Sequence, residues 1–152
     1  MSGSLPDAVL FACNYNRVRS PMAEALFKHF YGTRAFVDSC GLKPDLSDEG
    51  IDPFVAVVMD EIGLDVSGHQ PKSFAQLEDD SFDVVISLTP EAQHRAVELA
   101  RARATDIEYW PTHDPTLADG SRDAMLAAYR EVRDALATAI RQRFGAPSTF
   151  GG

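Results

Sequence analysis

The sequence has few cysteines and no long apolar run. Its 152 residues include two cysteines, Cys13 and Cys40, too few for a disulfide framework and without the CxxC spacing of a zinc site. No apolar run has the length of a transmembrane helix, and the first residues lack the basic and apolar regions of a secretory signal. We therefore expect a soluble cytoplasmic protein with no membrane partner.

Positive charge is also scarce. The chain has 14 Lys and Arg residues against 23 Asp and Glu residues, and its formal net charge is -9. A field of this sign repels polyanions, so the composition argues against a general nucleic-acid binder, and any anion site must be local. With 45% hydrophobic residues, the chain is expected to form one globular domain over residues 1–152, with a flexible tail at 146–152.

Strand and helix patterns alternate along the chain. Apolar runs predict strands at 8–13, 35–39, 82–88 and 107–110. Helical periodicity predicts helices at 20–31, 54–62, 90–103 and 121–144. This alternation implies an α/β fold of three layers, in which helices flank a four-stranded parallel sheet.

The predicted sheet places two reactive side chains on one edge. Ligands of such sheets bind beyond the carboxyl ends of the strands. Cys13 ends the first predicted strand, and Asp114 follows the fourth. We expect these two residues, far apart in the sequence, to lie at the same edge.

The loop from Cys13 to Arg19 has the chemistry of an anion site. Its backbone N–H groups and the positive end of the helix that begins near Ser20 can form an anion cradle. Arg19 adds a planar fork of donors that matches two oxygens of a phosphate-like group. The same field stabilises the thiolate of Cys13, which is then placed to attack the central atom of a bound oxyanion.

Each candidate site residue, taken alone, also has an ordinary structural interpretation. A cysteine that ends a strand is most often a small buried hydrophobe, and we expect this of Cys40, which has Leu46 six residues later where Cys13 has an arginine. Asp-Pro is a common turn opener. His69 and His113 are candidates to line the site, although loop histidines are more often polar surface residues.

The segment CNYNRVRSPMAE, residues 13–24, resembles the phosphate loop of the low-molecular-weight protein tyrosine phosphatases, Cys-x-Gly-Asn-x-Cys-Arg-Ser-Pro. The segments DSCGL, GLDVSGHQPKSF and THDPT resemble later parts of that family. The resemblance implies that Cys13 is the nucleophile, Arg19 the phosphate-binding arginine and Asp114 the general acid and base. It implies a substrate-binding loop made of Asn14, Tyr15, Asn16, Arg17, Val18 and Ser20, with Ser20 stabilising the thiolate and Asn16 in a left-handed conformation.

The reaction that the resemblance implies is hydrolysis of a phosphate monoester through a phosphocysteine, without metal or cofactor. The substrate would be a phosphorylated protein or a small phosphate ester. Four positions depart from the family pattern: Tyr15 replaces a glycine, Val18 replaces a second cysteine, and Thr116 and Leu117 stand where many members have aromatic residues. The loop around Leu46 also lacks an aromatic residue, so selectivity for phosphotyrosine stays open.

Two alternatives remain at this stage. Some relatives with this loop attack arsenate and pass it to a thiol, and the segments YWPTHDP and YREVRDAL resemble that branch. Because ISLTPEAQ, residues 86–93, contains no cysteine, arsenate reduction by this chain would need an external thiol. The second alternative is a phosphate-binding module without turnover.

Overall fold

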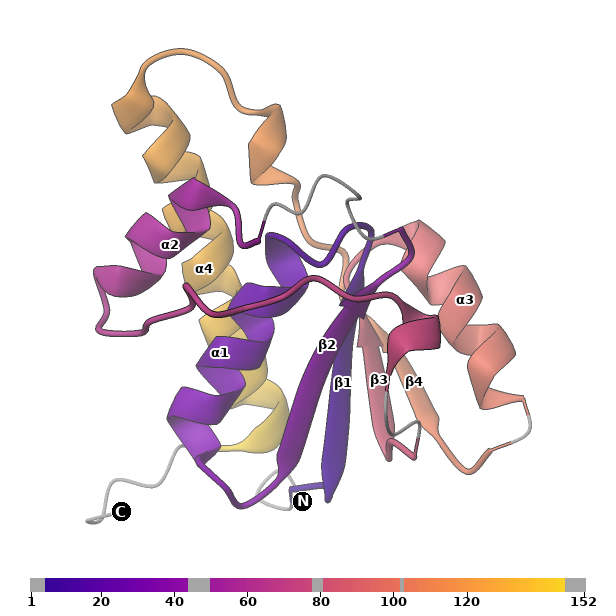
Figure 1. Cartoon of the computed structure of the whole chain (residues 1–152). Helices are drawn as coiled ribbons and strands as arrows, with labels where there is room; N and C mark the ends of the chain where they lie inside the picture. The colour runs from indigo at the N-terminus through magenta and orange to yellow at the C-terminus, as the bar shows by residue number, and fades with distance from the viewer. Residues whose placement is uncertain (1–4, 44–49, 78–80, 102, 147–152) are drawn as a thin grey trace.

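A computed structural model describes residues 5–43, 50–77, 81–101 and 103–146 (Figure 1). Within them the sheet consists of β1 (Ala8–Cys13), β2 (Phe36–Gly41), β3 (Val84–Ser87) and β4 (Asp106–Tyr109). All pairs are parallel, in the order β2-β1-β3-β4. The helices are α1 (Arg19–Tyr31), α2 (Pro53–Asp60), α3 (Pro90–Ala100) and α4 (Arg122–Phe144). The predicted α/β architecture is confirmed.

Helices cover both faces of the sheet. Figure 1 shows α1, α2 and α4 on one side and α3 on the other. Strand β1 is buried on both faces, and its side chains alternate: Phe11 and Cys13 join the core under α1 and α4, whereas Leu10 joins the core under α3. None of the described helices is long and apolar enough to cross a lipid bilayer.

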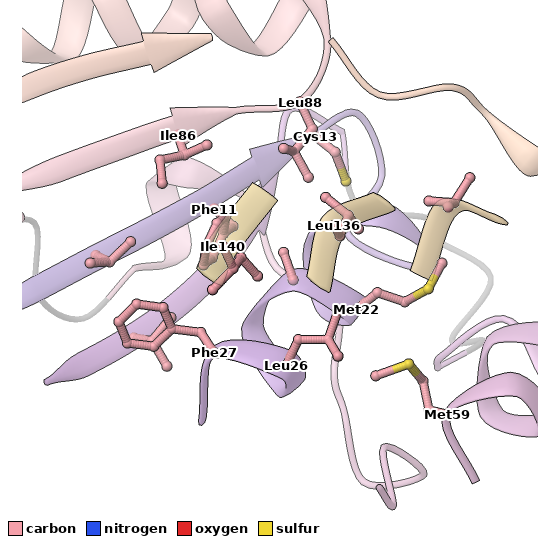
Figure 2. Close-up of a cluster of buried hydrophobic side chains, with 14 of the residues drawn as sticks. Phe11, Cys13, Met22, Leu26, Phe27, Met59, Ile86, Leu88, Leu136 and Ile140 are labelled. Atoms are coloured by element: carbon pink, nitrogen blue, oxygen red, sulfur yellow. The ribbon is translucent and has the colours of Figure 1, made fainter. Parts of the chain in front are cut away.

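The larger core lies between the sheet and α1, α2 and α4. The predicted apolar face of α4 is buried along its length, at Leu126, Tyr129, Val132, Leu136, Ile140 and Phe144. The rings of Phe27 and Phe144 pack edge to face with their centroids 5.3 Å apart. Figure 2 shows Cys13 where β1 ends, at the margin of this core, with Leu88 beside it. The core therefore fixes the position from which the phosphate loop starts.

Some element ends differ from the predictions. Strand β2 continues to Gly41, where the Gly41 N–H donates to the Lys72 carbonyl at 2.8 Å, so Cys40 lies within the strand and does not end it. Helices α2 and α3 end earlier than predicted, because each is followed by a turn. In the turn after α2, for example, the Gly63 N–H donates a hydrogen bond to the Asp60 carbonyl. The 3-10 turns Phe74–Gln76 and Pro115–Leu117 were not predicted, since three residues show no periodicity. The region around Leu46 and the tail from residue 147 lie outside the described residues.

Candidate active site

The predicted site residues gather around one cavity at the carboxyl edge of the sheet. The cavity has a volume of about 450 Å³ and is lined by Cys13, Tyr15, Arg17, Val18, Arg19, Lys43, Asp52, Asp114 and Thr116. The N-cap of α1, Val18, makes no side-chain hydrogen bond to the first amides of the helix. These amides, at the positive end of the helix, are therefore suited to hold an anion in the cavity.

Cys13 lies at the end of β1 with only 3% of its surface exposed. Its sulfur is 2.9 Å from the hydroxyl oxygen of Ser20, which also accepts a hydrogen bond from the Asn16 amide at 2.8 Å. The single proton of Ser20 can go to the Cys13 sulfur or, at 3.4 Å, to the Cys40 carbonyl. The shorter distance favours donation to sulfur, which is the geometry that the expected role of Ser20 requires.

Asn16 holds the phosphate loop from inside. It is fully buried and has a φ of 58°, so the predicted left-handed conformation is confirmed. The Lys72 backbone N–H can only donate, so it faces the Asn16 Oδ1 at 3.0 Å and fixes the orientation of the amide. The Nδ2 group then donates to the hydroxyls of Ser20 and Ser39, at 2.8 and 2.9 Å. Every polar atom of this side chain is therefore used to shape the loop.

Three further residues support the phosphate loop, a role that the sequence does not predict for them: Ser39, Glu24 and His69. Ser39 accepts from Asn16 and donates its own proton to Glu24 Oε1 at 2.6 Å. His69 Nε2 lies 2.8 Å from the Asn16 carbonyl, which can only accept, so this nitrogen carries the proton. Burial lowers the pKa of His69 below its usual value. His69 thus supports the loop and does not line the cavity that contains Cys13. His113 does not line it either, but lies in a neighbouring cavity between Trp110 and α4.

Arg19 closes one side of the cavity. Its side chain is 11% exposed, its Nη1 donates to the Thr112 carbonyl at 3.0 Å, and its Nη2 lies 3.9 Å from Asp114 Oδ2. The Thr112 bond uses one of the five guanidinium N–H donors and fixes the plane of the group. The donors that remain can face an oxyanion in the cavity.

Exchange of Arg19 for lysine is expected to weaken anion binding strongly. Lysine offers a point charge and cannot hold the Thr112 carbonyl and two oxyanion oxygens in one plane, so we expect the affinity for inorganic phosphate to fall by about 10²-fold. Protection of Cys13 from alkylation by increasing phosphate measures this affinity. An unchanged protection curve would show that Arg19 does not contact the anion.

Asp114 reaches the cavity from the turn after β4. Its Oδ1 accepts hydrogen bonds from the backbone N–H and the hydroxyl of Thr116, at 3.0 and 2.7 Å, which leaves Oδ2 toward Arg19. The side chain is 30% exposed, so solvent can exchange protons with it. This arrangement suits a group that gives a proton to a leaving oxygen and takes one from water.

The predicted substrate-binding residues divide into two groups. Tyr15, Arg17 and Val18 line the cavity, whereas Asn14, Asn16 and Ser20 do not. Asn14 instead accepts a hydrogen bond from the Thr89 hydroxyl at 2.7 Å. The cavity is also lined by Lys43, Asp52 and Thr116, which the sequence does not indicate as ligand-binding residues.

The side chain of Cys40 lies on the other face of the sheet from that of Cys13. Its strand neighbour on β1 is Ala12, and both join the core on the α3 face, whereas Cys13 belongs to the core on the other face. Burial raises the pKa of Cys40, so its thiol stays protonated and unreactive. The expectation that Cys40 is a packed small residue is confirmed.

Comparison with known proteins assigns the chain to a family. The profile of the low molecular weight phosphotyrosine protein phosphatases matches residues 8–146. The chain belongs to this family. Its sequence is 36% identical over 125 residues to a glutaredoxin arsenate reductase of Synechocystis sp., covering 82% of this chain and 86% of that protein. Curated relatives at 25–29% identity are also named arsenate reductases.

Similar solved structures include both arsenate reductases and tyrosine phosphatases. An arsenate reductase in its oxidized state has a TM-score of 0.74 and 26% identity, covering 91% of this chain and 96% of that one. The tyrosine phosphatase amsI of Erwinia amylovora has a TM-score of 0.69 and 22% identity, covering 91% and 93%. At 22% identity, the similarity to this phosphatase supports only the assignment of the fold.

Proposed function

We propose that this protein is an arsenate reductase that takes its electrons from an external thiol. The observation that carries the proposal is the similarity to the curated arsenate reductases, which extends over most of the chain. The site supports it, because Cys13, Arg19 and Asp114 surround a cavity with the donors that a tetrahedral oxyanion needs. Since the only other cysteine, Cys40, lies on the opposite face of the sheet, the reducing thiol must come from outside.

In the first step, the Cys13 thiolate forms a bond to arsenic while an As–O bond breaks. Asp114 gives a proton to the departing oxygen, which leaves as water, and Arg19 with the loop amides holds the remaining oxygens. The sulfur of Cys13 lies at the buried end of the cavity, so an incoming thiol meets the arsenic atom first. The first thiol therefore forms an S–As bond, and a second oxygen leaves as water.

Reduction follows when a second thiol attacks the sulfur of the first. The two thiols leave as a disulfide, and the electron pair of the broken S–As bond stays on arsenic, which becomes As(III). Water then cleaves the Cys13–As bond, releases arsenite and restores the thiolate. Overall, arsenate and two thiols give arsenite, one disulfide and one water.

The direct test is arsenite formation by the purified protein. We expect arsenite to appear only when arsenate and a small thiol are both present, in a 1:1 ratio with the disulfide. Arsenic speciation by coupled chromatography and mass spectrometry measures the product. Thiol-independent hydrolysis of p-nitrophenyl phosphate, with no arsenite formed, would refute the proposal, and phosphate binding without either reaction would indicate a binding module.

Phosphate monoester hydrolysis is the second candidate, because Asp114 is equally well placed to serve it. This carboxylate lines the cavity, where it can protonate an ester oxygen as well as an arsenate oxygen. If the protein is a phosphatase, Asp114→Asn is expected to lower kcat by about 10²-fold on phenyl phosphate, because the leaving phenolate needs a proton. The loss with p-nitrophenyl phosphate is smaller, since that leaving group departs without protonation. Equal losses on both esters would argue against proton transfer by Asp114.

A further inference from the structure

A second carboxylate, Asp52, lines the cavity together with Asp114. Asp52 is the N-cap of α2, where its Oδ1 accepts a hydrogen bond from the Phe54 N–H at 2.8 Å. Its Oδ2 accepts another from the hydroxyl of Tyr129 on α4, at 3.0 Å. One carboxylate is therefore held by two different helices.

The place of Asp52 relative to the phosphate loop is also fixed. The Asp52 N–H donates to the Arg17 carbonyl at 3.2 Å, and Arg17 Nε donates to the Gly50 carbonyl at 2.9 Å. Tyr129 is buried, and its ring packs against Phe54 with the centroids 5.3 Å apart. Asp52 therefore contributes a charge of fixed position to the cavity wall, unlike a flexible surface carboxylate.

Helix capping does not explain why this residue is charged. Asparagine or serine caps a helix about as well as aspartate. Inside a cavity that binds an oxyanion, a carboxylate opposes the ligand by Coulomb repulsion. Burial and the neighbouring Asp52 charge raise the pKa of Tyr129, so its hydroxyl remains a donor to a charged carboxylate. Arg17, Arg19 and Lys43 line the same cavity and supply the positive charge that an oxyanion needs. A fixed negative charge on the wall beside them adds a place for a positively charged group of a second molecule that enters the cavity.

We propose that Asp52 is a specificity-determining residue that selects an aminothiol as the reducing co-substrate. The ammonium group of such a thiol lies against the Asp52 carboxylate while its sulfur reaches the arsenic atom. The bound oxyanion and Asp52 both repel an anionic thiol, and both attract a cationic one. This inference deepens the proposed function and rests on it for the identity of the co-substrate.

Alkylation of Cys13 tests the charge preference without any turnover. The reagents are cationic 2-bromoethylamine, neutral iodoacetamide and anionic iodoacetate, with intact-protein mass spectrometry as the readout. Asp52→Asn keeps the helix cap and nearly the same volume. The measured quantity is the ratio of the alkylation rate with 2-bromoethylamine to that with iodoacetate, each divided by the rate with iodoacetamide. We expect Asp52→Asn to lower this ratio by about fivefold. Lys43→Gln removes the opposite charge from the same cavity and is expected to raise the ratio.

Two controls separate the charge of Asp52 from its structural role. Asp60→Asn makes the same charge change in α2 at a residue that does not line this cavity, and is expected to leave the ratio unchanged. Tyr129→Phe removes the hydrogen bond but keeps the carboxylate, so the cation preference persists. An unchanged ratio in Asp52→Asn, or an equal change in Asp60→Asn, overturns the inference.

Turnover with thiols of matched size completes the test. With saturating arsenate, we expect kcat/KM for cysteamine to exceed that for 3-mercaptopropionate, and Asp52→Asn to lower this ratio by about fivefold. A ratio that is the same in the variant and the wild type overturns the selection of an aminothiol. If no thiol supports arsenite formation, the proposed function fails, while the alkylation ratio still decides whether Asp52 selects cations in the cavity.

Discussion

Replacement of Cys13 by serine is expected to lower the rate of arsenate reduction by at least about 10³-fold, because an un-ionised hydroxyl is a far weaker nucleophile than a thiolate. The same loss is expected for any phosphate ester that the protein hydrolyses. Ser20 and Asn16 keep their own hydrogen bonds in the variant, so the loop stays in shape. Inorganic phosphate should therefore still bind, which isothermal calorimetry can measure alongside the rates.

Cys40→Ala is the matched control for this variant. Cys40 is fully buried among apolar side chains on the other face of the sheet, so its removal costs some packing but no step of the reaction. We expect its turnover to equal that of the wild type under conditions where the variant is folded. Loss of activity in Cys40→Ala at unchanged Tm would mean that the second thiol takes part, and would contradict the external-thiol mechanism.

Gly41→Ala is expected to disable the site without changing any side chain that lines the cavity. A Cβ atom on Gly41 would lie 2.8 Å from the Asn16 nitrogen, 2.8 Å from the Tyr15 carbonyl carbon and 2.9 Å from the Asn14 oxygen. All three are backbone atoms of the phosphate loop, so the loop itself must move. We expect activity to fall by at least about 10²-fold and the free energy of unfolding by roughly 1–3 kcal/mol.

Phosphate affinity and chemical denaturation together measure this effect. Gly68→Ala is the control, because a Cβ there meets nothing within 4 Å. Its free energy of unfolding is expected to change by no more than about 0.5 kcal/mol. If Gly41→Ala bound phosphate with wild-type affinity, the close approach of β2 to the loop would have no part in forming the anion site.

Local patterns in the sequence predicted most of the fold. The uncharged strand ahead of Cys13 and the spacing of three and four along α4 both reflect burial, which acts on neighbouring residues in the chain. The prediction of a left-handed conformation for Asn16 came from the resemblance of residues 13–24 to the family's phosphate loop, and not from a pattern of burial. The ends of β2 and α2 were not predictable, because hydrogen bonds to Lys72 and within a following turn decide them.

The parts of the site that come from distant segments were the harder ones to predict. Asp52 reads as an ordinary helix cap before Pro53, and nothing near it in the sequence indicates Tyr129 or the cavity. The sequence makes His69 a candidate to line the site, whereas in the structure it supports the loop through the Asn16 carbonyl. Such roles depend on which segments the sheet order brings together, and the periodicity of one segment carries no information about that.

The placement of the two thiols on opposite faces of the sheet also determines how the protein meets oxidants. Peroxide converts a reactive thiolate to a sulfenic acid, which a nearby second thiol can trap before further oxidation makes the damage permanent. Here Cys40 is on the other face of the sheet from Cys13, so no such rescue is available within the chain. Protection of Cys13 must then come from a thiol outside the chain, and under the proposed mechanism the loss of that thiol would both stop turnover and leave the nucleophile open to irreversible oxidation.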